Sequence, residues 1–278
     1  MLSNYSNEEE PTSKFEEVPY VLPNNIAELS RLNIQHYIFR YVRKGNYGAP
    51  ISKDVKRILD VGCGTGIWAK DMSLLFPDTM FDGIDVNGGI DPENDFPNFT
   101  FTQGDILKGL PYKDNTFDFV YQRLLVAGMP ATAWPKLCAE LIRVVKPGGW
   151  IEIIDTDIYF RDYGPAWKQL EPYFTAFMKK RGIDPYVVQE IPNFVKQGGL
   201  SNIHHSRHVS PMGISNSEID KFMVKDLSMI FANMMPLFVA ASGKTEQQIS
   251  QLLKEFEKEC FEYKTYGFAY YTWGQKPL

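Results

Sequence analysis

Cysteine and uninterrupted apolar sequence are both scarce in this chain of 278 residues. The three cysteines, Cys63, Cys138 and Cys260, are odd in number and far apart, which argues against a disulfide framework and favours a reducing compartment. The longest apolar stretch, residues 229–241, is interrupted by polar and proline residues and is too short to cross a bilayer. The beginning of the chain is acidic rather than basic and then apolar, so we expect no signal peptide and no membrane partner.

Basic residues are fewer than acidic ones, and the formal net charge is −5. This balance argues against a nucleic-acid partner, which a basic surface would attract. The hydrophobic content of 44% is that of an ordinary soluble protein with a substantial core, arranged as one large domain or two small ones. No basic localisation cluster stands out, so we expect the cytoplasm and leave the nucleus open.

Three glycines lie close together within residues 57–66. An apolar run of strand-forming residues contains Asp60, and Gly62, Gly64 and Gly66 then alternate with small residues. Residues 67–72 have the pattern of the first turns of a helix. Glycines allow a ligand to approach the backbone, and a helix start offers free N–H donors, so the segment predicts a cofactor cradle. The third glycine comes one residue too early for a dinucleotide-binding fingerprint.

Four further segments follow the glycine loop in order. Residues 81–85 form a second strand pattern that ends in Asp85, and residues 99–106 form a third that ends in Gly-Asp-Ile. Residues 117–121 have a fourth strand pattern, and residues 141–150 lead from a helix into a fifth. Alternating strands and helices imply right-handed crossovers and a parallel sheet.

Together these segments resemble the class I S-adenosylmethionine (SAM)-dependent methyltransferases over residues 57–155. Two further pieces, Tyr20-x-x-Pro23 and Glu28-x-x-Arg31-Leu32-x-x-Gln35-His36, are similar to fungal LaeA-like methyltransferases, as is Gly66-Ile67-Trp68-Ala69. The resemblance implies a three-layer α/β/α Rossmann-like fold with a mostly parallel seven-stranded sheet and an antiparallel last strand. It also implies SAM as cofactor, with S-adenosylhomocysteine (SAH) as product.

We expect a flexible tail over residues 1–18 and a single methyltransferase domain over residues 19–278. Within it, residues 20–50 would form an N-terminal lid helix and residues 51–155 the cofactor-binding core. Residues 156–278 would supply substrate-covering helices and a sheet-edge hairpin. The periodicity predicts helices over residues 164–181, 186–197, 215–235 and 244–260, and strands over residues 202–209 and 266–273.

The resemblance assigns the cofactor-binding positions, which are Tyr20, Arg31, Asp60, Gly62, Cys63, Gly64, Asp85, Val86, Asp105, Ile106, Gln122 and Arg123. Asp85 would accept both ribose hydroxyls, and Val86 would lie against the adenine. Asp105 would accept from the adenine amino group, and Ile106 would cover a face of the ring.

The remaining assignments concern the methionine portion. Asp60 would order the glycine loop or reach the amino group through water. Gln122 and Arg123 would contact the methionine end or the substrate, and Tyr20 and Arg31 would reach the carboxylate from the lid. Each position has a simpler alternative: a strand-terminal acid can be only a loop-ordering cap, and Arg31 can pair with Glu28 along its own helix.

Catalytic residues are assigned less firmly, and His36 and His204 are the candidate bases. His204 lies in a histidine cluster, residues 204–208, where alternate side chains of a strand share one face. Metal binding would need carboxylate or thiolate partners that the neighbouring sequence does not offer, so we expect no metal. A solvated strand is the simpler alternative. Positioned substrates also react without a base.

Three functions remain open at this stage. The first is methyl transfer to an oxygen or nitrogen nucleophile of a small, secondary metabolite, walled by aromatic residues of the C-terminal half. The second is a LaeA-like regulator that acts mainly through protein partners, with methylation secondary. An enclosed pocket would favour the first and an exposed apolar patch on the lid or tail the second. The third, a nicotinamide-dependent oxidoreductase, is disfavoured by the glycine spacing.

Overall fold

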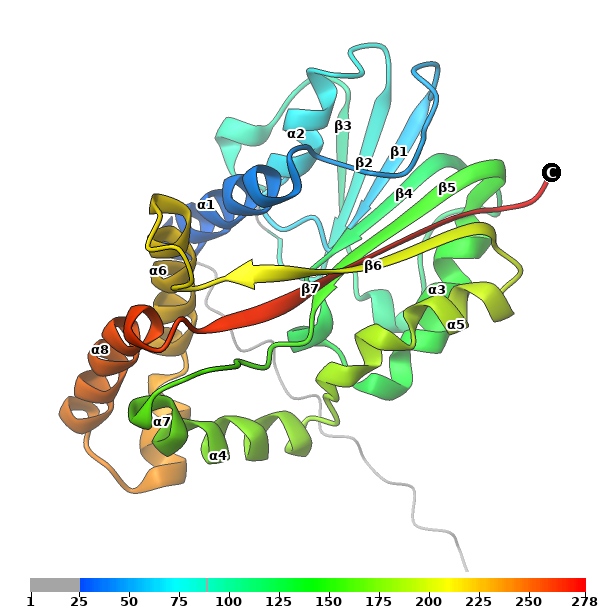
Figure 1. Ribbon diagram of the computed structural model, residues 1–278. Helices are drawn as coiled ribbons and strands as arrows, with labels where there is room; N and C mark the ends of the chain where they lie inside the picture. The colour runs from blue at the N-terminus through cyan, green and yellow to red at the C-terminus, as the bar shows by residue number, and fades with distance from the viewer. Residues whose placement is uncertain (1–25, 89) are drawn as a thin grey trace, which may run out of the picture.

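A seven-stranded sheet in the order β3-β2-β1-β4-β5-β7-β6 runs through the computed structural model, which describes residues 26–88 and 90–278 (Figure 1). The strands are β1 (Arg57–Val61), β2 (Met80–Asp85), β3 (Phe99–Gln103), β4 (Phe117–Arg123), β5 (Val145–Thr156), β6 (Ser201–Pro211) and β7 (Tyr266–Gln275). The first five are parallel, and β7 is antiparallel to both β5 and β6. The expected sheet with an antiparallel last strand is therefore confirmed. The edge pair β6–β7 is joined by three helices rather than by a turn.

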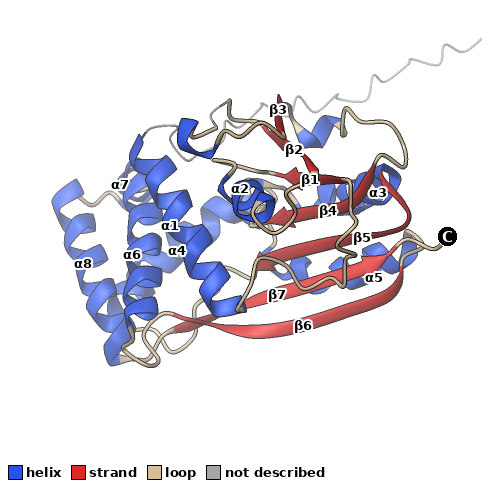
Figure 2. Ribbon diagram, turned by 90° about the horizontal axis from the view of Figure 1, so that it is seen from above, coloured by secondary structure: helices blue, strands red, loops and turns tan. Residues whose placement is uncertain are grey.

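Helices cover both faces of the sheet and one of its ends (Figure 2). They are α1 (Ile26–Arg43), α2 (Ile67–Ser73), α3 (Trp134–Val144), α4 (Pro165–Lys180), α5 (Ile191–Gln197), α6 (Glu218–Asn233), α7 (Met235–Ser242) and α8 (Glu246–Glu262). Helices α3 and α5 lie on one face and α2 on the other, while α1, α4, α6, α7 and α8 gather beyond the carboxyl end of β5. Any ligand bound at that end of the sheet is therefore enclosed by helices.

Two predicted helices differ from those observed. The helix predicted over residues 186–197 begins as a 3-10 turn, Pro185–Gln189, and becomes α-helical only at Ile191, because Pro192 lacks an N–H and fits the first turn. The helix predicted over residues 215–235 ends at Asn233 and resumes as α7, with Pro236 in its first turn. Within the described residues no single helix is long and apolar enough to cross a membrane; α6 and α7 qualify only as a pair bent by 60°.

Buried aromatic side chains fill the space on both sides of β4 and at the helical end. Trp68 of α2 stacks on Tyr121 of β4 with ring centroids 3.8 Å apart and planes 1° apart, and both are almost fully buried. At the helical end, Trp167 of α4 packs against Phe231 of α6 and Phe256 of α8. These contacts fix α2, α4 and α6, which border the candidate site.

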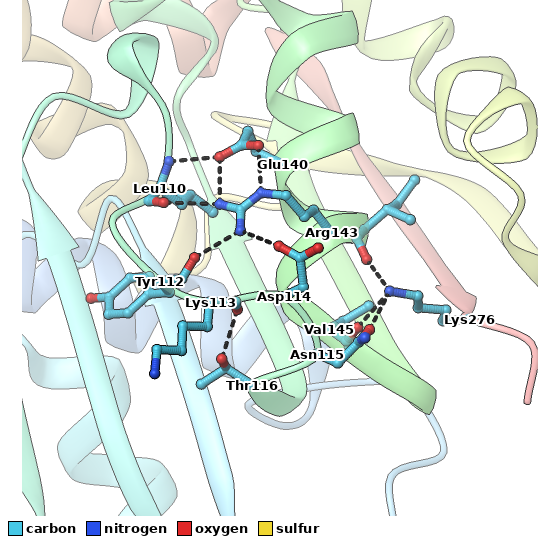
Figure 3. Close-up of polar contacts among 11 residues, drawn as sticks. Leu110, Tyr112, Lys113, Asp114, Asn115, Thr116, Glu140, Arg143, Val145 and Lys276 are labelled. Carbon is cyan, nitrogen blue, oxygen red and sulfur yellow. Dashed lines mark hydrogen bonds and ion pairs between the residues drawn. The ribbon is translucent and has the colours of Figure 1, made fainter.

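Arg143 of α3 is the centre of a hydrogen-bond network that holds the loop between β3 and β4 (Figure 3). Arg143 donates to the carbonyl oxygens of Leu110 (2.9 Å) and Tyr112 (2.7 Å) and to the carboxylates of Glu140 (2.7 and 2.8 Å) and Asp114 (2.8 Å). Glu140 in turn accepts from the Leu110 N–H at 2.8 Å. This network fixes the segment that follows the Asp105 turn.

Candidate functional site

A cavity of about 960 Å³ lies at the carboxyl ends of β1, β2 and β4. The strand order reverses between β1 and β4, and open α/β sheets bind ligands at such a point. One wall is the glycine loop, residues 62–65, and another is the face of α1 that carries Leu29 and Leu32. Helix α1 is tied to the loop because the Thr65 hydroxyl donates to Asn33 Oδ1 at 2.7 Å. The N-terminal helix therefore covers the cavity as a lid.

The glycine loop needs its glycines for conformation and for space. Gly62 and Gly64 have φ values of 71° and 51°, in the left-handed region that L side chains rarely adopt. A Cβ on Gly62 would also lie 2.6 Å from the Cδ2 atom of Leu125. The loop N–H groups are used in part by the neighbouring strand, since Gly62 and Cys63 both donate to the Ile84 carbonyl (2.8 and 3.2 Å).

Asp85 stands at the rim of this loop. Its Oδ2 accepts from the Gly64 N–H at 2.9 Å, and its Oδ1 accepts from the Asn87 N–H at 2.9 Å. Burial raises the pKa of the carboxyl, while the backbone donors oppose that rise. Each oxygen keeps a further lone pair, and the side chain lines the cavity. The arrangement suits two adjacent hydroxyl donors.

The outer part of the cavity pairs a second acid with apolar side chains. Asp105 caps the 3-10 turn Ile106–Lys108 by accepting from the Leu107 N–H at 3.0 Å. Val86, Ile106 and Leu107 line the cavity beside it. Val86 and Leu107 are 47% and 39% exposed, so their apolar surfaces are open to a ligand in the cavity. A flat ring with an amino group fits this part.

The inner part of the cavity holds Asp60 and Arg123. Asp60 is only 4% exposed, and burial raises its pKa to about 7 although the guanidinium of Arg123 opposes the rise. Arg123 lines the cavity, and within residues 26–88 and 90–278 no carboxylate lies within ion-pair distance of it. A buried acid beside an unneutralised guanidinium suits a zwitterion, such as an amino acid.

A second, more apolar cavity of about 210 Å³ adjoins the first. The two share Leu32 and Gln35 of α1 and residues 124, 125 and 128 of the loop after β4. Its other walls come mostly from α4, α6 and the strand ends, and its aromatic lining comprises Phe39, Tyr159, Phe160, Phe174, Phe177, Phe231 and Phe268. Helices α4 and α6 thus cover it as expected, whereas α5 packs against α3 and the sheet instead.

Comparisons with known proteins agree with this geometry. Residues 58–149 match the family model of a methyltransferase domain. The chain is 27% identical over 272 residues to the N-methyltransferase verN of Clonostachys rogersoniana, with 93% of each chain covered. It is 34% identical over 145 residues to the secondary metabolism regulator LAE1 of Cochliobolus heterostrophus, covering 50% of this chain and 46% of that protein. Residues 58–149 thus match a methyltransferase domain, and nearly the whole chain is similar to an N-methyltransferase.

Solved structures support the same fold for this protein. Phosphoethanolamine N-methyltransferase 2 of Haemonchus contortus, in complex with S-adenosyl-L-methionine, superposes with a TM-score of 0.53 at 17% identity. The match covers 93% of this chain and 54% of that one. At this level of identity the similarity concerns the fold, so the contacts of SAM with individual residues rest on the cavity described above.

Of the predicted cofactor residues, most line the larger cavity, namely Asp60, Gly62, Cys63, Gly64, Asp85, Val86, Asp105, Ile106 and Arg123. Tyr20 lies outside the described residues. Arg31 is 2% exposed and holds Glu28 (2.7 and 2.9 Å) and Asp226 of α6 (2.7 Å). It borders the second, more apolar cavity, and its charge is already matched by two carboxylates, which leaves Arg123 as the better partner for an anion.

Gln122 does not reach either cavity. It is completely buried and lies 3.3 Å from the carboxylate of Asp155. Asp155 also accepts from the N–H groups of Leu125 (2.8 Å) and Val126 (3.1 Å). Gln122 therefore lies behind the loop and supports it through Asp155, rather than lining a cavity as predicted.

Neither predicted base lines either of the two cavities. His204 lies on the edge strand β6, where it stacks on Trp273 with centroids 3.9 Å apart and faces solvent. His36 is completely buried on the side of α1 that faces α2, and burial lowers its pKa. Both expectations of a catalytic base are corrected by these positions.

Three residues that border the second cavity were not among the predicted site residues: Gln35, Asp155 and Asp226. Asp155 could have been predicted from the sequence, because it lies near the end of a buried strand, as Asp85 does. Gln35 and Asp226 carried none, since their contact, 2.9 Å long, joins helices far apart in the chain.

Proposed function

We propose that the protein transfers the methyl group of SAM to a nitrogen or oxygen nucleophile of a small, largely apolar metabolite. The observation that carries this proposal is the position of the second, aromatic cavity, which we call the acceptor cavity. It adjoins the larger cavity, which we call the cofactor cavity, across residues 124–128 and α1. Enclosed apolar pockets with few polar groups are typical of small-molecule sites. The N-methyltransferase relative, similar over nearly its whole length, supports a nitrogen acceptor.

The residues of the cofactor cavity would bind SAM in a single orientation. Asp85 would accept from the ribose hydroxyls and Asp105 from the adenine amino group, with Val86 and Ile106 against the ring. At the inner end, Asp60 would face the ammonium group and Arg123 the carboxylate. The sulfonium of SAM supplies an activated methyl group, and the protein orients the acceptor and excludes water.

The acceptor cavity offers no free general base among the residues that the structure describes. It contains no histidine, lysine or cysteine, and its carboxylates already accept hydrogen bonds. Asp157 holds Arg161 (2.5 and 3.1 Å), and Asp226 holds Arg31 and Gln35. Asp155, whose pKa burial raises to about 7, is only 1% exposed and accepts from the N–H groups of Leu125 and Val126. We therefore infer an acceptor that needs no base before attack: a neutral amine, which loses its proton after transfer, or an acidic hydroxyl that is already ionised.

The test is methyl transfer from isotope-labelled SAM to panels of apolar amines, phenols and carboxylic acids. The matched variant is Leu227→Trp, which fills the acceptor cavity without touching the cofactor cavity. We expect transfer to fall at least about tenfold while SAH affinity, measured by calorimetry, stays unchanged. Transfer that survives Leu227→Trp on every active acceptor would place the acceptor elsewhere.

A second candidate function, regulation through a protein partner, is favoured by one observation on α1. Ile34, Tyr37 and Tyr41 lie at helical spacing and are 43%, 50% and 71% exposed. They form an apolar stripe on the outer face of the lid helix, and a regulator similar to LAE1 would need such a surface.

Complementation of a deletion strain separates the two functions. If regulation through a partner dominates, an Asp85→Ala variant restores the phenotype and a variant with serine at the three stripe positions does not. If methyl transfer dominates, the outcomes are reversed.

A further inference from the structure

Arg123 has an unusual environment for a guanidinium that lines a cofactor cavity. Within the described residues it forms no ion pair, and its one hydrogen-bonded side chain is His36, whose Nδ1 lies 3.2 Å from Nη2. The guanidinium also lies over the ring of Phe39, 5.7 Å from its centroid. The direction in which Arg123 points therefore depends on His36.

The chemistry of the contact fixes the protonation state of His36. A guanidinium carries only donors, so Nδ1 of the imidazole must accept. The ring proton then lies on Nε2, which is 2.9 Å from Asp71 Oδ2 and donates to it. The hydrogen bonds thus require the neutral Nε2–H tautomer, held between an acid and a guanidinium.

Asp71 is itself fixed in place. It lies on α2, the helix that the glycine loop begins, and it also accepts from Arg40 of α1 at 2.5 Å. His36 is fully buried, and Asp71 is 8% exposed. The chain Asp71–His36–Arg123 therefore connects α2, α1 and the end of β4 behind the inner part of the cofactor cavity.

We propose that His36 is a positioning residue that holds the Arg123 guanidinium toward the carboxylate of the bound cofactor. This inference rests on the proposed function for the assignment of Arg123 to that carboxylate. His36 does not touch the cofactor, because it lines neither cavity. It replaces the carboxylate that usually orients an arginine, and so leaves the charge of Arg123 available to the ligand.

A pH dependence follows from this arrangement. The charged groups that face His36 are Asp71 on α2, Arg40 on α1 and Arg123 on β4. Burial, Arg123 and Arg40 all disfavour the imidazolium, and only Asp71 favours it. Once the ring is protonated, Nδ1 carries a hydrogen and can no longer accept from Arg123. We therefore expect SAH affinity to fall as the pH drops below the ordinary range of histidine.

Calorimetric titration with SAH tests the proposal on four variants: His36→Asn, His36→Leu, Arg123→Met and the double variant His36→Leu/Arg123→Met. Asparagine places an oxygen acceptor near the position of Nδ1 and does not titrate, whereas leucine offers no acceptor. Both lose the donor to Asp71, so they are matched in that respect. Thermal melting checks that each variant folds.

At pH 7.5 we expect about tenfold weaker SAH binding for His36→Leu and binding within about threefold of wild type for His36→Asn. In the Arg123→Met background His36→Leu should cause no further loss, because the two residues act through one contact. Between pH 7.5 and 5.5, His36→Asn should lose less affinity than wild type. Asp60 and Arg123 are both present in wild type and in His36→Asn, so the comparison of these two proteins isolates the titration of His36.

Two results would overturn the proposal: equal losses for His36→Asn and His36→Leu, or a further loss from His36→Leu in the Arg123→Met background. Both would indicate a general structural role. Failure of the proposed function is a different outcome, in which Arg123→Met binds SAH as tightly as wild type does.

Discussion

Asp85 Oδ2 lies 2.9 Å from the backbone nitrogen of Gly64, which joins the acid at the end of β2 to the middle of the glycine loop. The contact is short because β1 and β2 are parallel neighbours, with Asp60 opposite Gly83 and Val61 opposite Ile84. The loop and the acid are thereby preorganised before a cofactor binds, and a ligand that uses both gains affinity without ordering them.

Replacement of Asp85 by alanine should weaken SAM and SAH binding about 100-fold, because two charge-assisted hydrogen bonds to the ribose are lost. Isothermal titration measures the effect. The matched control is Asp82→Asn on the same strand, whose carboxylate holds Arg57 (2.7 and 2.8 Å) outside the cavity. That variant should melt earlier yet bind SAH normally. Equal affinity of Asp85→Ala and wild type would contradict the assignment.

Asp105→Asn should change the base preference of the site. The wild-type carboxylate accepts from an adenine amino group and repels the carbonyl oxygen of hypoxanthine, while asparagine can donate to that oxygen. We expect the preference for SAH over its inosine analogue to fall about tenfold or more in the variant. Competition binding with the two nucleosides measures it. Asp114→Asn, whose carboxylate accepts from Arg143 and lines neither cavity, serves as the control and should leave the preference intact.

SAM affinity should rise with pH through about 7 because burial raises the pKa of Asp60 to about 7. The cationic cofactor favours the carboxylate, so binding at lower pH must release a proton, which costs up to about tenfold in affinity per pH unit. Asp60→Asn should remove the part of this dependence that is centred near pH 7 and leave the fall at more acidic pH that His36 causes. Calorimetry in buffers of different ionisation enthalpy counts the protons released, and a count of zero at pH 6 would refute the prediction.

The same raised pKa makes the stability of the fold change with pH in the opposite direction to SAM affinity. Between about pH 4 and 7 the folded protein keeps a proton on Asp60 that the unfolded chain has lost, so the free energy of unfolding contributed by this group falls as the pH rises across that window. Urea unfolding of wild type and Asp60→Asn at pH 5 and 8 should show the smaller difference between pH values in the variant.

Arg31→Met should destabilise the fold by about 3–5 kcal/mol, because it removes the guanidinium that two buried carboxylates, Glu28 and Asp226, share. Urea unfolding followed by circular dichroism measures the loss. Neutralising the two acids in the same chain, as Glu28→Gln and Asp226→Asn, should recover part of the stability. No recovery in the triple variant would indicate that Arg31 acts through packing rather than through charge.

Much of the fold followed from local sequence. The alternation of strand and helix patterns predicted β1 to β5, and a capping box at Thr245 and Gln248 begins α8 close to the expected residue. The helix expected over residues 215–235 ends close to the expected residue, at Asn233, but α7 was not predicted; it follows at Met235 and packs Phe238 into the core.

The candidate site was likewise predictable only in part. Residues at strand ends, such as Asp85 and Asp105, were predictable because the carboxyl ends of parallel strands meet at one edge of the sheet. Gln122 was assigned by the resemblance and His204 was a candidate base, and the structure places the first behind a loop and the second on the edge strand.

The sequence by itself determined the cofactor and its cradle, since a strand, a glycine turn and a helix are neighbours in the chain and their geometry is local. Only the tertiary structure decided which arginine is available to an anion. Arg31 meets Asp226, 195 residues away, and is neutralised, while Arg123 meets His36 and keeps its charge. Such pairings depend on how helices pack across the end of the sheet, and no local pattern encodes that packing.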